Sequence, residues 1–315
     1  MVSTLPTFTA EFLQRNPVQD ILLARFCTMR IGGAAALVTL EDRRDLRELL
    51  ASPVRWLGKG ANLLIGDGAA AETVVRLGEQ FSHLELGTVQ GGVAVVRAGA
   101  GLDLAKLMAA TTAAGLAGPE GLAGVPATVG GALRMNAGTT TCWMLDWVSR
   151  VEVVLPGEEF PRWLERAAIP AGYRDCGLPQ GTVFLGCEMQ LAAADPAVLQ
   201  ANARRLKQTK AASQPLAARS AGCVFRNPSR ECPAGKLIDE LGLKGSRIGA
   251  AMVSPVHANF IVNDGEATAA DVTALIQRIR YTAWRERGII LQLEVETWNI
   301  DAIVHAHPEV AGEQP

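Results

Sequence analysis

The sequence lacks the usual marks of a metal-binding, membrane-spanning or nucleic-acid-binding protein. None of its six cysteines forms a C-x-x-C pair, and its four histidines do not fall at zinc-ligand spacing. No apolar run reaches about 18 residues, and the N-terminus has no basic segment ahead of an apolar one. With 30 Lys and Arg against 32 Asp and Glu, the formal net charge is -2, so no overall field attracts an anionic polymer or surface. We therefore expect a cytoplasmic protein with mostly reduced, buried thiols that holds no metal and binds neither nucleic acid nor membrane.

Aromatic residues are also few, at 5% of the chain, and only Tyr173 and Tyr281 are tyrosines. The remaining composition, 49% hydrophobic and 20% charged over 315 residues, is that of a globular protein. A chain of this length predicts two or three domains. Its composition gives no oligomeric state.

Two glycine-rich segments stand out. The stretch from Gly121 to Gly138 places glycine among small or β-branched residues and carries almost no charge. Because glycine lacks a Cβ and adopts positive φ, we expect the backbone N–H groups of Val129 to Ala132 to lie against a ligand's phosphate oxygens or flat ring. A tight buried turn is the alternative that composition leaves open. The second segment, Gly58 to Leu64, follows a short expected strand and indicates either a nucleotide loop or a hairpin turn.

These loops do not predict a Rossmann domain. Its G-x-G-x-x-G pattern lies between a strand and a long helix, and the third glycine is missing after residues 58–60 and 99–101. Residues 66–71 match a looser form of the pattern, but strand character resumes at Val74, too soon for a crossover helix. We interpret residues 66–71 as a turn.

Instead, the first segment resembles a flavin-contacting segment of the UDP-N-acetylenolpyruvoylglucosamine reductase (MurB) family of peptidoglycan synthesis. Leu122-Ala-Gly-Val-Pro-Ala-Thr-Val-Gly-Gly131, followed by Asn136-Ala-Gly138, is similar to the family's Leu-Ala-Gly-Ile-Pro-Gly-Thr-Val-Gly-Gly and Asn-Ala-Gly. The other loop resembles Gly-Gly-Gly-Ser-Asn-Leu-Leu, which grips the FAD pyrophosphate; Lys59 and Ala61 are departures. The resemblance thus implies non-covalent FAD on residues Gly58, Lys59, Gly60, Ala61, Asn62, Leu63, Leu64, Gly124, Val125, Pro126, Thr128, Val129, Gly130, Gly131, Asn136, Ala137 and Gly138.

Three further motifs resemble the family's catalytic segments. They are Tyr173-Arg-Asp-Cys176, Ser220-Ala-Gly-Cys-Val-Phe-Arg-Asn-Pro228 and Leu291-Gln-Leu-Glu-Val-Glu296. The resemblance implies that Arg174 meets the substrate's carboxylate, that Cys223 replaces the family's proton-donating serine, and that Glu294 pairs with the arginine site. Without it, Arg174 is a solvated ion-pair partner and Cys223 a packed loop residue. Only the motif separates Glu294 from Glu296, since we expect both on one face of a strand spanning Ile289 to Trp298.

A thiol also fits the chemistry of a proton donor. With an ordinary pKa near 8.5, Cys223 is mostly protonated at neutral pH, which predicts loss of activity above that pKa and sensitivity to alkylation. Substrate contacts implied by the resemblance are Tyr173, Arg226, Asn227 and Asn259. The segments 234–245 and 257–263 also match the family closely, although His257 alone indicates a structural histidine.

Two features depart from the family pattern. Thr139-Thr-Thr-Cys-Trp143 replaces the family's Ala-Tyr-Gly or Ala-His-Gly after Gly138, and no tyrosine-bearing insertion lies between residues 176 and 220. The second feature indicates the shorter subtype, which lacks a substrate-covering tyrosine loop.

We therefore predict an α+β protein with a vanillyl-alcohol-oxidase type FAD-binding fold in two subdomains (22–192), followed by an α+β substrate-binding domain (193–300). A loosely attached lead-in (1–21) and a tail (301–315) flank them. By resemblance, NADPH reduces FAD, and UDP-N-acetylglucosamine enolpyruvate is then reduced to UDP-N-acetylmuramate. The alternatives are an FAD-dependent oxidase or dehydrogenase acting on another substrate, and a non-catalytic nucleotide-binding module.

Overall fold

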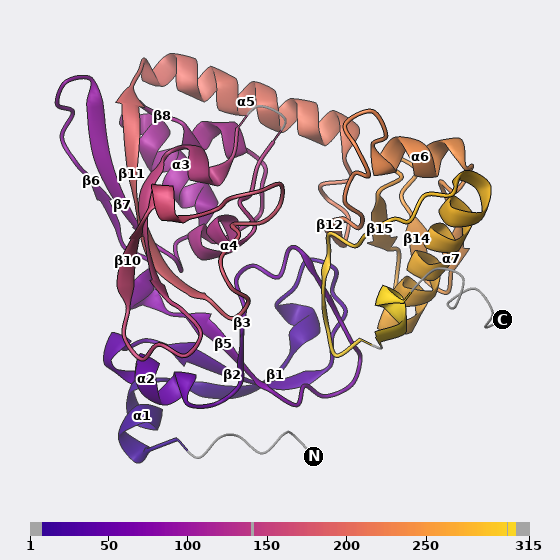
Figure 1. Ribbon diagram of the computed structural model, residues 1–315, viewed down its shortest axis with the longest axis horizontal. Coiled ribbons are helices and arrows are strands. Elements are labelled where there is room, and N and C mark those ends of the chain that lie inside the picture. The colour runs from indigo at the N-terminus through magenta and orange to yellow at the C-terminus, as the bar shows by residue number, and fades with distance from the viewer. Residues whose placement is uncertain (1–7, 140–141, 301, 307–315) are drawn as a thin grey trace.

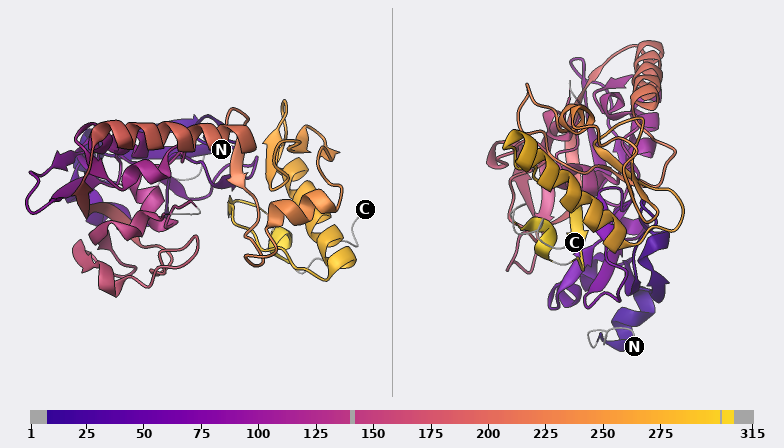
Figure 2. Two further views of the ribbon diagram at one scale, coloured as in Figure 1. Left: turned by 90° about the horizontal axis from the view of Figure 1, so that it is seen from above. Right: turned by 90° about the vertical axis from the view of Figure 1, so that its right-hand side faces the viewer.

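The computed structural model describes residues 8–139, 142–300 and 302–306, and these form two bodies bridged by the long helix α5 (Figure 1). Helix α5, Pro196–Ser213, runs along one side of the larger body toward the smaller one, as the turned views also show (Figure 2). No helix among these residues is long and apolar enough to cross a membrane.

In the first sheet of the larger body, β2 and the start of β5 are buried on both faces, whereas β1 at the edge is largely exposed. Strand β1 is antiparallel to β2, whereas β2, β5 and β3 are parallel. The two-sided burial explains the continuous apolar run of β2, because neither of its faces meets water. Helices α1 and α2 share one core cluster with this sheet. The bounds are α1 Ala10–Arg15, β1 Val18–Leu22, β2 Ala34–Leu40, α2 Leu46–Leu50, β3 Val54–Trp56 and β5 Thr73–Leu77.

The second sheet of the larger body is antiparallel, in the order β10-β9-β11-β7-β6, with β8 beside β11. Its β7 alternates exposed and buried side chains, as expected of a sheet with one face in water. Helices α3 and α4 share the core cluster of its other face. The bounds are β6 Leu84–Leu86, β7 Val93–Gly99, α3 Leu104–Ala113, β8 Leu116–Ala117, α4 Val129–Arg134, β9 Val148–Val154, β10 Arg162–Glu165 and β11 Val183–Ala193.

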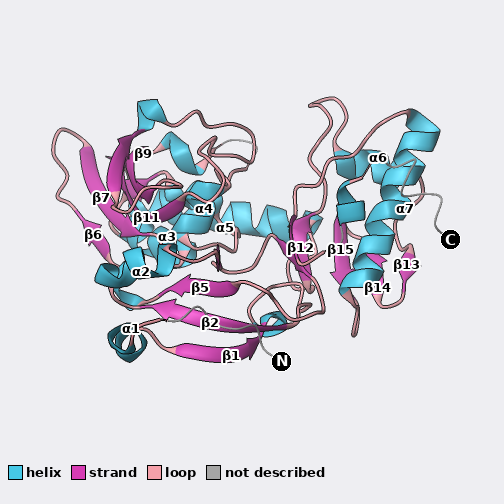
Figure 3. Ribbon diagram, turned by 60° about the horizontal axis from the view of Figure 1, so that its bottom comes forward, coloured by secondary structure: helices cyan, strands magenta, loops and turns pink. Residues whose placement is uncertain are grey.

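The smaller body is a four-stranded antiparallel sheet, β12-β15-β14-β13, with helices α6 and α7 beside it (Figure 3). The sequence Thr268-Ala-Ala-Asp271 predicts a capping box ahead of α7, and the structure confirms it. The Thr268 side chain accepts from the Asp271 N–H, and Asp271 accepts from the Thr268 N–H. The bounds are β12 Ser220–Cys223, α6 Ala234–Glu240, β13 Arg247–Ile248, β14 Ala251–Val253, β15 Phe260–Asn263 and α7 Ala269–Arg287.

The two bodies share a core and are not simply consecutive in sequence. Met29, Ile31 and Leu64 of the first part pack into the core cluster of the smaller body. Strand β16, Glu296–Trp298, returns to pair in parallel with β4, Leu63–Ile65. The expected domain start at residue 193 falls ahead of α5, which packs on α3 and the short helix η4, Pro119–Leu122, of the larger body.

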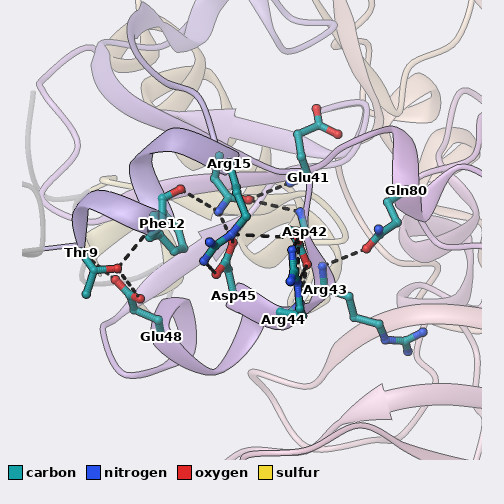
Figure 4. A network of polar contacts seen from close by, with 11 residues as sticks. Thr9, Phe12, Arg15, Glu41, Asp42, Arg43, Arg44, Asp45, Glu48 and Gln80 are labelled. Carbon is teal, nitrogen blue, oxygen red and sulfur yellow. Dashed lines mark hydrogen bonds and ion pairs between the residues drawn. The ribbon is translucent and has the colours of Figure 1, made fainter.

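The lead-in is not loosely attached from Phe8 onward, so that expectation is wrong there; residues 1–7 lie outside the described residues. The fully buried Asn16 donates its Nδ2 to Asp45 (2.7 Å). Arg15 donates its Nε to the same carboxylate (2.8 Å), as Figure 4 shows. Asp45 itself is only 4% exposed. Because Arg15 and Asn16 donate to it, the pKa of Asp45 lies below its usual value despite burial.

The expected strand from Ile289 to Trp298 is also wrong in its first part. Residues 289–295 form no strand, and only an isolated bridge joins Leu293 to Phe225. The buried Arg280 of α7 donates its Nε to the carbonyl of Leu291 (3.0 Å). This irregular segment is therefore fixed by side-chain and loop contacts rather than by a sheet.

Candidate active site

A cleft of about 2250 Å³ lies where the two bodies meet, and nearly all predicted site residues line it. Three regions form its walls: the loop 58–63, the segment 124–138 with the turn at 173–174, and residues of the smaller body around Cys223 and Glu294. Segments far apart in the sequence thus converge on one space.

The loop Gly58 to Ala61 offers a row of free backbone donors. Among the described residues, none accepts a hydrogen bond from the N–H groups of Gly58, Lys59, Gly60 or Ala61. Gly60 has φ +59°, and a Cβ on Gly58 would lie 2.9 Å from the Oγ1 of Thr128, so both glycines are needed for this close packing. Successive free N–H groups next to a left-handed residue form an anion-binding concavity, which fits a pyrophosphate. The side chain of Lys59 is paired with Asp103.

In the segment from Gly121 to Gly138, the N–H groups of Val129 to Ala132 are already bonded within the protein, so the expectation that they bind phosphate oxygens is wrong. The N–H groups of Val129 and Gly130 donate to the carbonyls of Leu102 and Ala100, each at 2.8 Å. Thr128 caps α4 by accepting from Gly131 (3.2 Å) through its side chain and from Ala132 (2.9 Å) through its carbonyl. Gly130 and Gly131 still line the cleft. A Cβ on Gly130 would lie 3.0 Å from that of Ala100, whereas one on Gly131 would meet only the Oγ1 of Thr128 at 3.4 Å, so Gly131 leaves a bare surface for a flat ring.

Arg174 and Glu294 meet across the cleft. The Nε of Arg174 lies 2.9 Å from the Oε1 of Glu294, and the two side chains are 25% and 9% exposed. This ion pair lacks hydrogen-bond geometry, so the buried Nε donor has no hydrogen-bond partner among the described residues. Arg174 also donates its Nη1 to the carbonyl of Gly138 (2.9 Å). Arg174 lines the cleft, so N–H groups of its guanidinium other than this buried Nε can bind a substrate carboxylate.

Burial controls the ionisation of Glu294 and Cys223. It raises the pKa of Glu294, and the charge of Arg174 opposes that shift. Burial, reinforced by the negative charge of Glu294, raises the pKa of Cys223 to about 12. The thiol therefore stays protonated at physiological pH, and the ordinary pKa expected of Cys223 is wrong. With it goes the reason to expect ready alkylation of this thiol.

Backbone contacts join these groups to the loop at residues 58–63. The Glu294 N–H donates to the carbonyl of Val224, which follows Cys223 (2.8 Å). The Nδ2 of Asn62 donates to the carbonyl of Glu294 (3.0 Å), so this side chain holds the Glu294 backbone. Glu296 also lines the cleft, and its N–H donates to the carbonyl of Asn62 (2.9 Å). Its carboxylate accepts from the Nε1 of Trp298 (3.0 Å), and within the described residues it forms no ion pair with Arg174.

Comparison with known proteins agrees with this geometry. The family model of the UDP-N-acetylenolpyruvoylglucosamine reductase C-terminal domain matches residues 214–298, and that of an FAD binding domain matches residues 34–161. The UDP-N-acetylenolpyruvoylglucosamine reductase of Nitrosococcus oceani is 41% identical over 281 residues, which cover 87% of this chain and 92% of that protein. The reductase of Thermus thermophilus is 39% identical over 282 residues, 89% and 99% of the two chains.

The crystal structure of the reductase (MurB) from Thermus caldophilus superposes with a TM-score of 0.80 at 37% identity, and the match covers 90% of this chain and 99% of that one. The chain belongs to the UDP-N-acetylenolpyruvoylglucosamine reductase family. The predicted fold class, an FAD-binding part in two subdomains followed by an α+β C-terminal part, is confirmed. Membership in this reductase family also disfavours both alternatives, the oxidase acting on another substrate and the non-catalytic module.

Four of the residues assigned to the reductase site do not line the cleft: Leu64, Val129, Asn136 and Asn259. All four are at least nine-tenths buried. Asn136 donates to the carbonyl of Gly172 (3.1 Å), which precedes the Tyr173 turn. Asn259 exchanges two hydrogen bonds with the backbone of Phe225, at 2.9 and 2.8 Å. These two asparagines thus hold the backbone next to Tyr173 and Arg226, which line the cleft.

The three remaining substrate residues do line the cleft. Asn227 joins the two bodies by donating to the hydroxyl of Tyr173 (3.4 Å), and its Oδ1 accepts from the N–H of Ala234 (3.0 Å). The positive charge of Arg226 also opposes the rise in the pKa of Glu294 that burial causes.

Trp143 and Lys210 are among the cleft residues that the sequence did not single out. Trp143 lies 5.7 Å, ring centroid to guanidinium carbon, from Arg174 and packs edge-on against Tyr173. It belongs to the segment that departs from the family motif, of which residues 140 and 141 lie outside the described residues. Lys210, near the end of α5, also lines the cleft, and burial together with the charge of Arg174 lowers its pKa. In the sequence, Lys210 is one of several basic residues of an expected helix, and that pattern does not indicate that it faces the site.

Proposed function

We propose that this cleft reduces the enolpyruvyl double bond of UDP-N-acetylglucosamine enolpyruvate to give UDP-N-acetylmuramate, with FAD bound and NADPH as reductant. The observation that carries the proposal is the contact between Arg174 and Glu294 beside the Cys223 strand. It brings a carboxylate-binding group and a proton donor to one place, and a carboxylated alkene needs both. Membership in the reductase family supports the same reaction.

FAD fits the residues that are present. The free N–H groups of Gly58 to Ala61 suit its pyrophosphate, and the bare surface at Gly131 suits a ring. When bound, FAD carries two electrons from NADPH to the enolpyruvyl group. We assign the 58–63 loop and the Gly124 to Gly138 segment to its binding.

Cations of the cleft are available for the phosphates of substrate and NADPH. Within the described residues, no Asp or Glu forms an ion pair with Lys210, Arg219, Arg226 or Arg230, all of which line the cleft. In this chain, whose net charge is near zero, local cations must hold such anionic ligands. We propose that Arg226 and Asn227 serve the UDP side of the substrate.

The proton is assigned to Cys223. Its thiol, kept neutral by burial, donates H⁺ to C2 of the enolpyruvyl group as C3 receives the hydride equivalent, and the resulting thiolate is reprotonated from water. Arg174 binds the carboxylate and stabilises the enolate-like charge that develops on it. Glu294 holds the guanidinium in place, and Tyr173 packs against the same group, 5.6 Å from ring centroid to guanidinium carbon.

We further propose that the protein acts in the cytoplasm on small molecules. All six cysteines are free thiols, which fits a reducing compartment. NADPH and UDP-linked sugars are metabolites of that compartment.

Enolpyruvyl-dependent NADPH oxidation tests the proposal. Purified FAD-loaded protein should oxidise NADPH rapidly with UDP-N-acetylglucosamine enolpyruvate and slowly with UDP-N-acetylglucosamine, which lacks the double bond. Mass spectrometry should show a product heavier than the substrate by two hydrogen atoms. Equal NADPH oxidation with both sugars, and no such product, would reject the function.

A further inference from the structure

The segment from Cys27 to Ile31 has no part in the chemistry described above, yet it lies between the two halves of the site. Thr28 lines the cleft, whereas its neighbours Met29 and Ile31 are buried in the core cluster of the smaller body. The Nδ2 of Asn263 donates to the carbonyl of Met29 (3.0 Å). The backbone around Thr28 is therefore held on the smaller body, although the segment belongs to the first part of the chain.

Thr28 contacts both functional loops at once. Its N–H donates to the carbonyl of Gly60 in the 58–63 loop (3.1 Å). Its hydroxyl Oγ1 donates to the carbonyl of Ser220 at 2.6 Å and lies 3.4 Å from the Gly60 carbonyl. A hydroxyl has one hydrogen, so the short contact to Ser220 is the bond it donates.

The Ser220 end of this bridge leads directly to Cys223 through an irregular stretch of strand. Strand β12 pairs with β15 at Ser220 and at Cys223, but the register shifts between them. Gly222 in this stretch has φ +78°, and a Cβ there would lie 3.9 Å from the carbonyl of Ala61. Because the pairing of β12 with β15 is interrupted here, its hydrogen bonds fix this part of β12 less completely. The hydrogen bond from Thr28 to Ser220 therefore contributes to the position of Cys223.

We propose that Thr28 is a positioning residue whose hydroxyl sets the placement of the Cys223 strand relative to the 58–63 loop. This rests on the proposed function, in which that loop binds FAD and Cys223 supplies the proton. The backbone N–H of Thr28 holds Gly60 whatever the side chain, whereas only the hydroxyl holds Ser220. Loss of the hydroxyl therefore affects proton delivery and leaves FAD binding and its reduction by NADPH unchanged.

Half-reactions of Thr28→Val test this, because valine keeps the side-chain shape and removes the hydroxyl. We expect full FAD content, reduction by NADPH within about twofold of the parent, and substrate-dependent reoxidation slowed on the order of 10- to 100-fold, as misplacement of a reacting group produces. Thr28→Ser, which keeps the hydroxyl, should reoxidise near the parent rate. Thr28→Ala also removes the hydroxyl and has a smaller side chain. If the valine variant does not fold, the same half-reactions are measured on the alanine variant.

Thr111→Val is the matched control. Thr111 is fully buried in α3, and its Oγ1 donates to the carbonyl of Leu107 (3.0 Å), so this change also removes a hydroxyl that donates to a carbonyl, outside the cleft lining. It should lower thermal stability without separating the two half-reactions. Parent-rate reoxidation of hydroxyl-free Thr28 variants, slow reoxidation of Thr28→Ser, or the same separation in Thr111→Val would overturn the role of Thr28. Parent enzyme that is not reoxidised by the enolpyruvyl substrate at all would instead reject the proposed function.

Discussion

Arg174 and Glu294 form an ion pair between the two bodies, with Nε 2.9 Å from Oε1. Arg174 lies on the turn that follows Gly172 in the larger body, and Glu294 is held by the backbone of Val224 in the smaller one. The site is therefore assembled only when both bodies are in place. Because Glu294 is buried, the guanidinium is its main source of charge compensation.

The first prediction concerns this pair. Arg174→Ala and Glu294→Gln should retain FAD and be reduced by NADPH, but slow substrate reduction by about 10²- to 10³-fold, as loss of one preorganised charge-stabilising group does. Stopped-flow measurement of the two half-reactions checks this. Glu296→Gln is the matched control, since this carboxylate contacts Trp298 instead and should be nearly silent. A crippled Glu296→Gln beside a normal Glu294→Gln would show that the acid is misassigned.

A second prediction follows from the raised pKa of Cys223. A neutral thiol is the proton donor, and with a pKa of about 12 it stays neutral from pH 6 to pH 10. Substrate-dependent reoxidation should therefore show no alkaline loss from thiol ionisation in that range, and iodoacetamide at pH 8 should inactivate only slowly. Because Cys223→Ser lacks this thiol, any activity that it loses on treatment with iodoacetamide is due to other thiols. Rapid inactivation that substrate prevents, and that Cys223→Ser lacks, would contradict this assignment.

Non-covalent attachment of FAD is the third prediction. Neither the 58–63 loop nor the Gly121 to Gly138 segment contains cysteine or histidine. Acid precipitation should release all the yellow colour into the supernatant. Flavin that stays with the pellet would point to a covalent bond, with Cys142, whose Sγ lies 3.3 Å from the Thr139 hydroxyl, and Cys27 as the thiols to examine.

A fourth prediction concerns stability away from the cleft. Asp45→Asn should lower the free energy of unfolding by about 1–3 kcal/mol at pH 7, because it weakens buried charge-assisted hydrogen bonds from Arg15 and Asn16. The folded-state pKa of Asp45 is lowered, so this stabilisation is present above the unfolded pKa near 3.9 and is lost as pH falls through the folded value.

Urea unfolding of parent and variant at pH 7 and at acidic pH measures that difference. The difference in free energy of unfolding between parent and Asp45→Asn should shrink as the pH falls. The exposed Asp20 of β1 provides the control, and Asp20→Asn should change stability little. A difference that grows on acidification would contradict the assigned role of Asp45.

The sequence predicted those features whose causes are local. Thr268 caps α7 as its motif predicts, and Asp195-Pro196 likewise predicts a helix start, where Asp195 accepts from the Ala197 N–H (2.8 Å). Apolar runs at residues 93–100 and 182–191 predict strands, which the structure has as β7 and β11 within a residue or two. Most residues that the motifs assign to the site do line the cleft. They were found by comparison with a family, which supplies tertiary information that spacing does not.

Features set by tertiary contacts were not predictable. Alternation placed Glu294 and Glu296 on one strand face, whereas β16 begins only at Glu296 and Glu294 is fixed by Val224. Glycine content predicted free donors at Val129 and Gly130, but two carbonyls from residues 100–102 already accept them. The pKa of Cys223 depends on burial between two bodies, which its neighbours in sequence do not reveal.

Proton donation by Cys223 is the central claim, and stopped-flow kinetics of Cys223→Ala test it most directly. After reduction by NADPH at near the parent rate, the variant's flavin should be reoxidised by the enolpyruvyl substrate about 10²- to 10⁴-fold more slowly, the contribution of a general acid. Cys223→Ser should recover much of the rate, because a hydroxyl can also donate. Reoxidation of Cys223→Ala at the parent rate would contradict the account and leave Cys223 a packed residue of β12.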